Sequence, residues 1–195
     1  EITLQPLKRF DFDAAIIFSD ILLLPYGLNQ KVEFKKNFGP ILGELENVNF
    51  SNTDENKFTE KLLPVYSSIK KVSHSLISQN KSLIGFVGAP WTILVYMLNK
   101  QSPKKELNSK LENLTENKRL IQVIIKYLKI HIKNQIKNGA DMIQIFDSWA
   151  GLVNRKDVDD LIYKPNAELV EFIKSLNVPA ICFPRETKNY VELIN

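Results

Sequence analysis

Cysteine is almost absent from this chain: Cys182 is the only one among 195 residues. One thiol can form neither an intramolecular disulfide nor a cysteine-based zinc site, and a reducing cytoplasm is the simplest setting for it. Cys182 lies in the apolar segment 179–183. We therefore interpret it as a small buried hydrophobic residue.

Long hydrophobic runs are also missing. A membrane-spanning helix needs about 20 apolar residues, and the longest candidate, 14–24, is interrupted by Ser19 and Asp20. The beginning of the chain has no signal-peptide pattern. We expect no membrane span, and the first residue, Glu1 in place of Met, favours a chain that starts within a longer protein.

Histidine is scarce, and glycine-rich phosphate turns do not occur. His74 and His131 lie in helical segments rich in Lys, Asn and Ser, so we expect both at the surface. Neither stands at metal-ligand spacing from another His or from Cys182, and we expect no metal site. Without a G-x-G-x-x-G or Walker sequence, a nucleotide-binding fold is not favoured.

Charge of one sign does not dominate. The chain has 26 Lys and Arg against 22 Asp and Glu, a net charge of +4. Its lysines alternate with Glu and Asn along helical segments, a pattern typical of solvated helix faces. Aromatic residues do not interleave with basic ones as in a base-stacking surface, so we do not expect nucleic-acid binding.

What the sequence does contain is an alternation of strand and helix patterns. Short apolar runs predict buried strands, at 14–19, 82–87, 142–146 and 178–183. Apolar residues at helical spacing predict helices, at 54–78, 91–98, 104–138 and 158–176, with the start of another after 183. We expect Pro64 to kink or break the first helix, the third to fall into two pieces around Thr115, and Pro165 to disturb the fourth.

Between the first strand and the first long helix, the segment 31–35 alternates and predicts part of a small hairpin. We expect Gly39 and Pro40 to break the chain after it.

Strands separated by helices indicate a parallel α/β fold. A doubly wound sheet would normally have a glycine-rich turn after its first strand, but 19–24 contains no glycine. A (β/α)8 TIM barrel instead places its chemistry at the carboxyl ends of several strands. A full barrel needs roughly 250 residues, so we expect residues 1–195 to be part of a single, incomplete barrel domain.

Polar residues that follow the apolar runs are the candidate site. Asp20 could accept hydrogen bonds or stabilise positive charge at a barrel mouth. Alternatively, 21–24 could begin a helix whose free amides are capped by Ser19 or Asp20. Tyr96, one helical turn after Thr92, could reach a substrate carboxylate or be a buried aromatic residue.

Ser148 follows the third run and could bind an anionic group. It has no general base nearby in the sequence, so we do not interpret it as a nucleophile. Asp147 could be structural, satisfying loop amides, and on position alone both residues are expected to form a turn.

Three longer segments add a resemblance to a known family. The segments 7–22, 83–97 and 139–151 closely resemble, in order and spacing, three motifs of the uroporphyrinogen decarboxylases. The resemblance covers most of the chain and implies a (β/α)8 barrel.

The resemblance implies an enzyme of porphyrin and haem biosynthesis. Its substrate would be uroporphyrinogen III, a tetrapyrrole with eight carboxylates, whose four acetate groups lose CO2 to give coproporphyrinogen III. It implies no metal, flavin or pyridoxal cofactor, and a cytoplasmic homodimer. Asp20 matches the aspartate that binds the pyrrole N–H groups and stabilises the protonated ring. Tyr96 and Ser148 match positions that contact substrate carboxylates.

Departures from the family pattern limit what this chain is expected to do alone. The arginine-rich signature that precedes the aspartate motif has no match, and neither His74 nor His131 matches the family's C-terminal histidine. The segment 99–103 replaces a glycine-rich stretch. We therefore expect residues 1–195 to be inactive by themselves.

Two alternatives remain. The first is a related barrel methyltransferase acting on corrinoid or thiol substrates, whose zinc ligands would be His and Cys at strand ends. The second is a non-catalytic barrel remnant, against which the presence of Asp20, Tyr96 and Ser148 argues. An arginine motif encoded upstream in frame would favour the decarboxylase.

Overall fold

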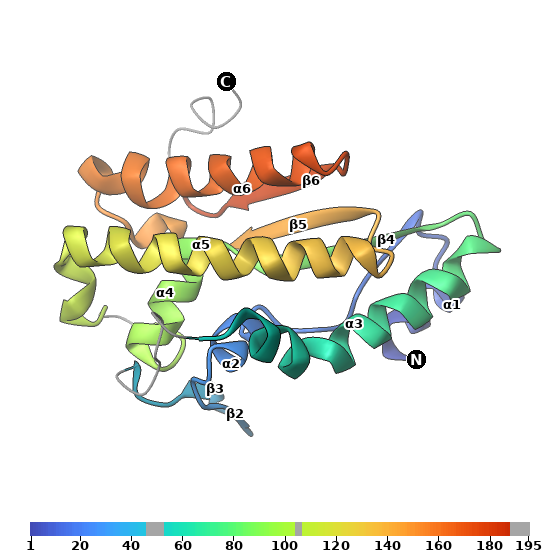
Figure 1. Ribbon diagram of the computed structural model, residues 1–195, viewed down its shortest axis with the longest axis horizontal. Helices are drawn as coiled ribbons and strands as arrows, with labels where there is room; N and C mark the ends of the chain where they lie inside the picture. The colour runs from blue at the N-terminus through green and yellow to red at the C-terminus, as the bar shows by residue number, and fades with distance from the viewer. Residues whose placement is uncertain (46–52, 104–106, 188–195) are drawn as a thin grey trace.

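The computed structural model describes residues 1–45, 53–103 and 107–187, and its centre is a four-stranded parallel sheet (Figure 1). The strands are β1 (Ala14–Ile16), β4 (Ser82–Gly88), β5 (Met142–Asp147) and β6 (Ala180–Pro184). They pair in the order β1-β4-β5-β6, which is also their order along the chain. All four predicted strands are thus confirmed.

Helices that connect the strands cover one face of this sheet (Figure 1). They are α3 (Glu55–Ile77), α5 (Leu114–Lys137) and α6 (Lys164–Ser175), while α4 (Pro90–Asn99) follows β4 directly. In a doubly wound sheet the strand order reverses and helices cover both faces. Sequential order with helices on one face is the arrangement of a β/α barrel wall.

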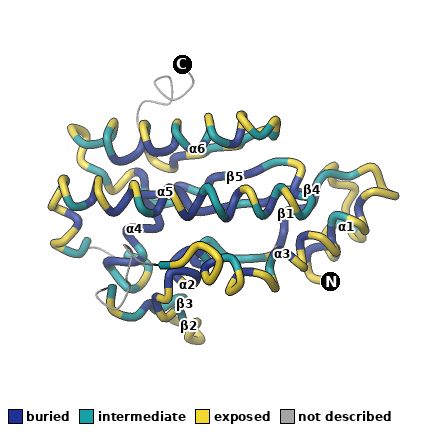
Figure 2. Tube along the Cα trace, viewed as in Figure 1, coloured by how far each residue is buried: buried dark blue, intermediate teal, exposed yellow. Residues whose placement is uncertain are grey.

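The two faces of the sheet differ sharply in burial. Figure 2 shows buried positions along β5. Leu83 and Ile143 point toward the helices and are fully buried. On the opposite face Phe18 is 70% exposed and Phe183 is 58% exposed. Since successive residues of a strand point to opposite faces, the sheet packs its core on the helix side and leaves an apolar inner face open in the described residues.

Shorter elements surround the sheet. Before β1 lie the 3-10 helix η1 (Ile2–Leu4) and helix α1 (Gln5–Arg9), which the sequence patterns did not predict. Helix α2 (Leu23–Gly27) leads to a hairpin of β2 (Val32–Lys35) and β3 (Gly39–Leu42). The predicted hairpin is confirmed, but the expected break is wrong, because Gly39 and Pro40 pair with Lys35 and Phe34 as the start of β3.

Pro64 does not divide α3, which is assigned as one helix from Glu55 to Ile77. The proline is exposed, so the backbone carbonyl that loses its N–H donor can be hydrated. The third predicted helix does fall into two pieces, a 3-10 turn at Ser109–Glu112 and then α5, although part of its start lies outside the described residues.

Pro165 lies in the first turn of α6, directly after a π-helical turn at Asp159–Tyr163. The predicted disturbance of this helix is therefore present. Short 3-10 turns at Ala150–Leu152 and Arg155–Asp157 fill the connection from β5. The helix expected at the end of the chain lies largely outside the described residues.

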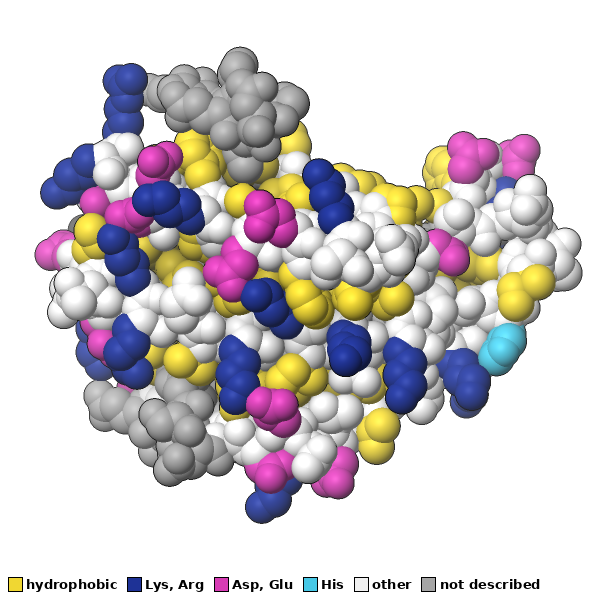
Figure 3. Space-filling view, turned by 45° about the horizontal axis from the view of Figure 1, so that its top comes forward, with side chains coloured by type: hydrophobic (Ala, Val, Ile, Leu, Met, Phe, Trp, Pro, Cys, Tyr) yellow, Lys and Arg dark blue, Asp and Glu magenta, His cyan; other side chains and the backbone are white. Residues whose placement is uncertain are grey.

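Charged side chains on the outer helices form pairs between neighbouring helices. Lys126 on α5 bonds Glu55 on α3 at 2.8 Å, and Lys129 on α5 bonds Glu168 on α6 at 2.7 Å. In the space-filling view, Lys and Arg lie as separate spots with Asp and Glu among them (Figure 3). This matches the solvated, mixed-charge faces predicted from the sequence.

His131 corrects the expectation that both histidines lie at the surface. It is 3% exposed on α5, and its Nδ1 lies 3.0 Å from the hydroxyl oxygen of Tyr66 on α3. His74 is exposed as expected. Burial lowers the pKa of His131 to about 4, because the charged imidazolium loses its hydration.

Gln135, one turn further along α5, compensates for the shortness of β1. Its Oε1 accepts from the backbone N–H of Phe86 at 3.1 Å, and its Nε2 donates to the carbonyl of Phe86 at 2.9 Å. The side chain reaches β4 over Gly85, where a Cβ would lie 2.6 Å from Gln135 Oε1. The side-chain amide of Gln135 therefore hydrogen-bonds both the N–H and the carbonyl of Phe86, which lies beyond the part of β4 that pairs with β1.

None of the helices in the described ranges is long and apolar enough to cross a membrane.

We expect Gln135→Leu to destabilise the fold by about 2–4 kcal/mol, because it leaves the partly buried N–H and carbonyl of Phe86 without these partners. Urea denaturation measures the effect. Gln79→Leu is the matched control, since exposed Gln79, in the turn after α3, donates to the carbonyl of Ser75 four residues earlier, and it should cost less than about 0.5 kcal/mol. Equal effects of the two variants would contradict the bridging role of Gln135.

We also expect His131 to make stability depend on pH. Its pKa is about 4 in the folded state and about 6.5 in the unfolded state. The unfolded state therefore gains a proton first, so the free energy of unfolding is highest above pH 6.5 and falls as pH drops toward 4. The pKa difference corresponds to about 3 kcal/mol of the free energy of unfolding, which is lost when the pH falls to 4 and below.

His131→Gln retains an acceptor for the Tyr66 hydroxyl but cannot titrate in this range. Urea titrations at pH 7 and pH 4.5 should show a smaller loss of stability for this variant than for the parent. His74→Gln, at an exposed site, should behave as the parent does. A His131→Gln profile that overlies the parent profile would rule out His131 as the source.

Candidate active site at the carboxyl ends of the strands

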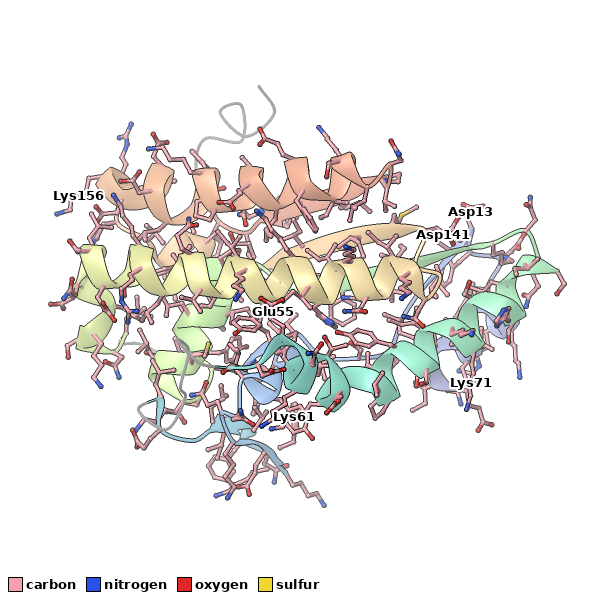
Figure 4. All side chains as sticks on the ribbon, in the orientation of Figure 1. Asp13, Glu55, Lys61, Lys71, Asp141 and Lys156 are labelled. Carbon is pink, nitrogen blue, oxygen red and sulfur yellow. The ribbon has the colours of Figure 1, made fainter. Side chains whose placement is uncertain are left out.

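The polar candidates lie at one edge of the sheet because its strands are parallel. Asp20 follows β1, Tyr96 lies on the helix that follows β4, and Ser148 follows β5. Figure 4 labels residues at both ends of the sheet: Asp13 and Asp141 near the amino ends of the strands, and Lys156 at the opposite end, beyond β5.

Asp20 is half-buried, and its Oδ1 accepts from the backbone N–H of Leu22 at 2.7 Å. This bond covers one amide of the turn before α2, as the capping alternative allowed, but Asp20 is not the cap of the helix, because the N-cap of α2 is Leu22 and that helix has no side-chain cap. Oδ2 has no hydrogen-bond donor among the described residues. Burial raises the pKa of the Asp20 carboxyl, and the N–H of Leu22 opposes that rise. An incoming N–H donor would therefore stabilise this carboxylate.

An apolar pocket of about 490 Å³ on the inner face of the sheet reaches Ser19, next to Asp20. Its lining includes Ile16, Phe18, Phe86 and Phe146, and the rings of Phe86 and Phe146 meet edge to face at 5.3 Å. None of these residues was predicted as a site residue from the sequence. Alternation along each strand was the signal that could have found them, since every second residue faces inward.

Tyr96 is half-buried on α4, as both sequence interpretations allowed. Its hydroxyl accepts from Ser102 Oγ at 3.3 Å. The ring meets the ring of Trp149 edge to face, with centroids 6.2 Å apart. Tyr96 is therefore in contact with the residue that follows Ser148.

Ser148 occupies a turn directly after β5 and is half-buried, in line with the expected turn. Asp147 is the last residue of β5 and is 1% exposed. The expectation that Asp147 satisfies loop amides is wrong, because its carboxylate accepts from the side chains of Thr92 and Asn166, each at 2.8 Å. Burial raises the pKa of Asp147 to about 6, against the effect of these two donors.

The turn that carries Asp20 packs closely against the start of α4. A Cβ at Gly88 would lie 3.1 Å from the Cβ of Ile21 and 2.6 Å from Cδ1 of Ile93. A side chain at position 88 would push the two segments apart. The ring contact of Trp149 thus links the Ser148 turn to Tyr96. The Asp20 turn packs against Gly88 at the end of β4, next to Ile93 of the same helix.

Cys182 is half-buried rather than fully buried and packs against the core. Burial, with a smaller contribution from the charge of Asp147, raises the pKa of its thiol to about 12. A thiol with so little thiolate at neutral pH is a poor nucleophile, which agrees with its interpretation as a small hydrophobic residue.

Metal ligands do not gather in the described ranges: no group of three or more His, Cys, Asp or Glu side chains there is placed to hold a metal ion.

Comparison with known proteins assigns the family. All of residues 1–195 match the family model described as uroporphyrinogen decarboxylase (URO-D). The chain belongs to the uroporphyrinogen decarboxylase family. It is 40% identical over 191 residues to the uroporphyrinogen decarboxylase of Rickettsia bellii, and 40% identical over 190 residues to that of Rickettsia felis.

Both alignments cover 95% of this chain but only 56% and 55% of the relatives. The chain thus spans about half the length of the curated uroporphyrinogen decarboxylases that it matches. A methyltransferase from Methanosarcina mazei has a similar structure, with a TM-score of 0.69 over 92% of this chain and 53% of that chain, at 14% sequence identity. At that identity the likeness concerns the fold alone.

The predicted fold class is confirmed. The chain is an α/β protein whose four parallel strands form part of a (β/α)8 barrel that is incomplete in this chain.

Proposed function

We propose that this chain is part of a uroporphyrinogen decarboxylase and supplies three of its substrate-contacting residues, Asp20, Tyr96 and Ser148. The observation that carries the proposal is the family match over all 195 residues. The substrate is uroporphyrinogen III and the product coproporphyrinogen III, within porphyrin and haem biosynthesis. Residues 1–195 belong to a single barrel domain of a cytoplasmic homodimer.

Each decarboxylation exchanges a carboxylate for a proton. Protonation of a pyrrole ring makes it an electron sink, so the electrons of the C–C bond to the carboxylate flow into the ring and CO2 leaves. A second protonation, at the side-chain carbon, gives the methyl group, and loss of the first proton restores the ring. One proton is consumed and one CO2 is released for each of the four acetate groups, with no change of oxidation state.

Asp20 has the properties that this reaction needs. Its Oδ1 is fixed by the N–H of Leu22, so the carboxylate is oriented before the substrate arrives. Its Oδ2 has no donor within the described residues and is available to pyrrole N–H groups. In a half-buried site beside an apolar pocket, a fixed negative charge stabilises a protonated pyrrole more strongly than it would in water.

The apolar pocket and the hydroxyl groups would bind different parts of the substrate. The faces of pyrrole rings are apolar and suit the walls formed by Phe18, Phe86 and Phe146. The hydroxyls of Tyr96 and Ser148 can donate to carboxylates at the rim without adding a titrating charge.

The first test compares residues 1–195 with the complete protein that contains them. We expect the complete protein to convert uroporphyrinogen III to coproporphyrinogen III under anaerobic conditions, followed by chromatography of the oxidised porphyrins. We expect residues 1–195 alone to form no product, because the inner face of their sheet is open. Product from residues 1–195 alone would overturn that expectation, and none from the complete protein would overturn the proposed function.

The second test separates the two roles of Asp20. Asp20→Asn retains an oxygen for the N–H of Leu22 but removes the charge, whereas Asp20→Ala removes both. We expect both variants to lose at least a hundredfold in kcat/KM, equivalent to about 2.7 kcal/mol. Only Asp20→Ala should lose stability, by about 1 kcal/mol, because it removes the hydrogen bond to Leu22. A loss of less than tenfold in Asp20→Asn would contradict the electrostatic role.

A further inference from the structure

Three buried polar side chains lie beneath the turn that carries Ser148. Thr92 is in the first turn of α4, Asp147 ends β5, and Asn166 is in the first turn of α6. Their exposed fractions are 0%, 1% and 1%. We call these three residues the Asp147 clamp. They come from three separate elements, so the clamp ties two consecutive helices to the strand between them.

The hydrogen bonds of the Asp147 clamp converge on the Asp147 carboxylate. Thr92 Oγ1 donates to Asp147 Oδ1 at 2.8 Å, and Asn166 Nδ2 donates to Asp147 Oδ2 at 2.8 Å. The backbone N–H of Trp149 then donates to Thr92 Oγ1 at 3.0 Å. Because Thr92 has given its only proton to Asp147, its oxygen must act as the acceptor for the turn.

Burying a carboxylate costs free energy because it loses its hydration. Apolar residues could pack this part of the core without that cost. What the carboxylate does achieve is to fix the orientation of one hydroxyl. That hydroxyl holds the backbone N–H of the residue directly after Ser148. It belongs to the same helix as Tyr96, one turn earlier, and the Tyr96 ring contacts the ring of Trp149.

We propose that Thr92 is a positioning residue: oriented by Asp147 and Asn166, its hydroxyl sets the placement of Ser148 relative to Tyr96, and thereby the spacing at which two carboxylates of one substrate are bound. This inference rests on the proposed function, in which Ser148 and Tyr96 contact carboxylates. Thr92 itself does not touch the substrate.

The test uses Thr92→Val, which has the same shape but lacks the hydroxyl, and Thr92→Ser, which retains the hydroxyl and loses a methyl group. In the complete protein we expect Thr92→Val to raise KM for uroporphyrinogen III about tenfold with kcat within about twofold, because binding in the ground state and in the transition state weaken together. Thr92→Ser should remain within about twofold of the parent in both constants.

A double-mutant cycle shows whether Thr92 acts through Ser148. If it does, Thr92→Val combined with Ser148→Ala should have the same KM as Ser148→Ala alone. Effects that multiply, or a Thr92→Val variant equal to the parent, would overturn the inference. A variant that is only less stable would show a lower melting temperature and unchanged KM, which also overturns it.

Should Thr92→Val fail to fold, Asn166→Ala loosens the clamp without touching Thr92. We expect about a threefold rise in KM that disappears in the Ser148→Ala background, and a rise that persists there would overturn the inference.

Hydrogen exchange separates this inference from the proposed function. The amide of Trp149 should lose protection in Thr92→Val and keep it in Thr92→Ser, whether or not the parent acts on uroporphyrinogen. An inactive parent would overturn the proposed function and with it the role in substrate spacing. If the parent is active but the Trp149 amide is equally protected from exchange in Thr92→Val, then Thr92 does not position the turn and the inference is overturned.

Discussion

All four strands of the larger sheet run in the same direction, and the candidate site depends on this constraint. Every strand delivers its following turn to one edge, so residues far apart in the sequence meet there without any special long-range contact. Asp20, Thr92 and Ser148 follow three successive neighbours in the sheet. The register between β4 and β5, which pairs Gly88 with Phe146, then sets the height at which the turns leave the sheet.

The apolar runs of the sequence predicted the strands. The polar residues that follow these runs, together with the absence of glycine from 19–24, predicted the barrel class and the edge at which the candidates lie. His131 and Gln135 were missed for a physical reason that periodicity could have revealed. They continue the stripe of Ile124 and Leu128 at helical spacing, and all four are buried. Polar residues on an apolar stripe need partners inside the protein, and those partners, Tyr66 and the backbone of Phe86, lie on other elements.

Some features could not be read from the sequence because they depend on tertiary contacts. Whether Pro64 divides α3 depends on which side of the helix meets the core, and here the proline faces water. The partners of Asp147 come from α4 and α6, so no local pattern around Asp147 could name them. The turn at Asp20 is different, because the acceptor and the donor are only two residues apart.

Asp20 and Asp147 both follow apolar runs, yet the pleat of the sheet separates their roles. Phe146 faces the inner pocket, so its neighbour Asp147 points to the helices and has a donor at each oxygen. Asp20 lies beyond the end of its strand and has a donor at only one oxygen among the described residues. A carboxylate with both oxygens occupied can position its neighbours, while one with a free oxygen can bind a ligand.

The open inner face connects stability with activity. Removing a side chain such as Phe18 or Phe183 from water is worth about 1.5–3 kcal/mol, and these residues stay exposed while the chain spans half the length of its relatives. In the proposed complete barrel, the segments that cover this face would also exclude water from the pocket beside Asp20. Exclusion of water strengthens electrostatic interactions, so under the proposed function closing the barrel would complete the hydrophobic core and the electrostatic site of Asp20 in one step.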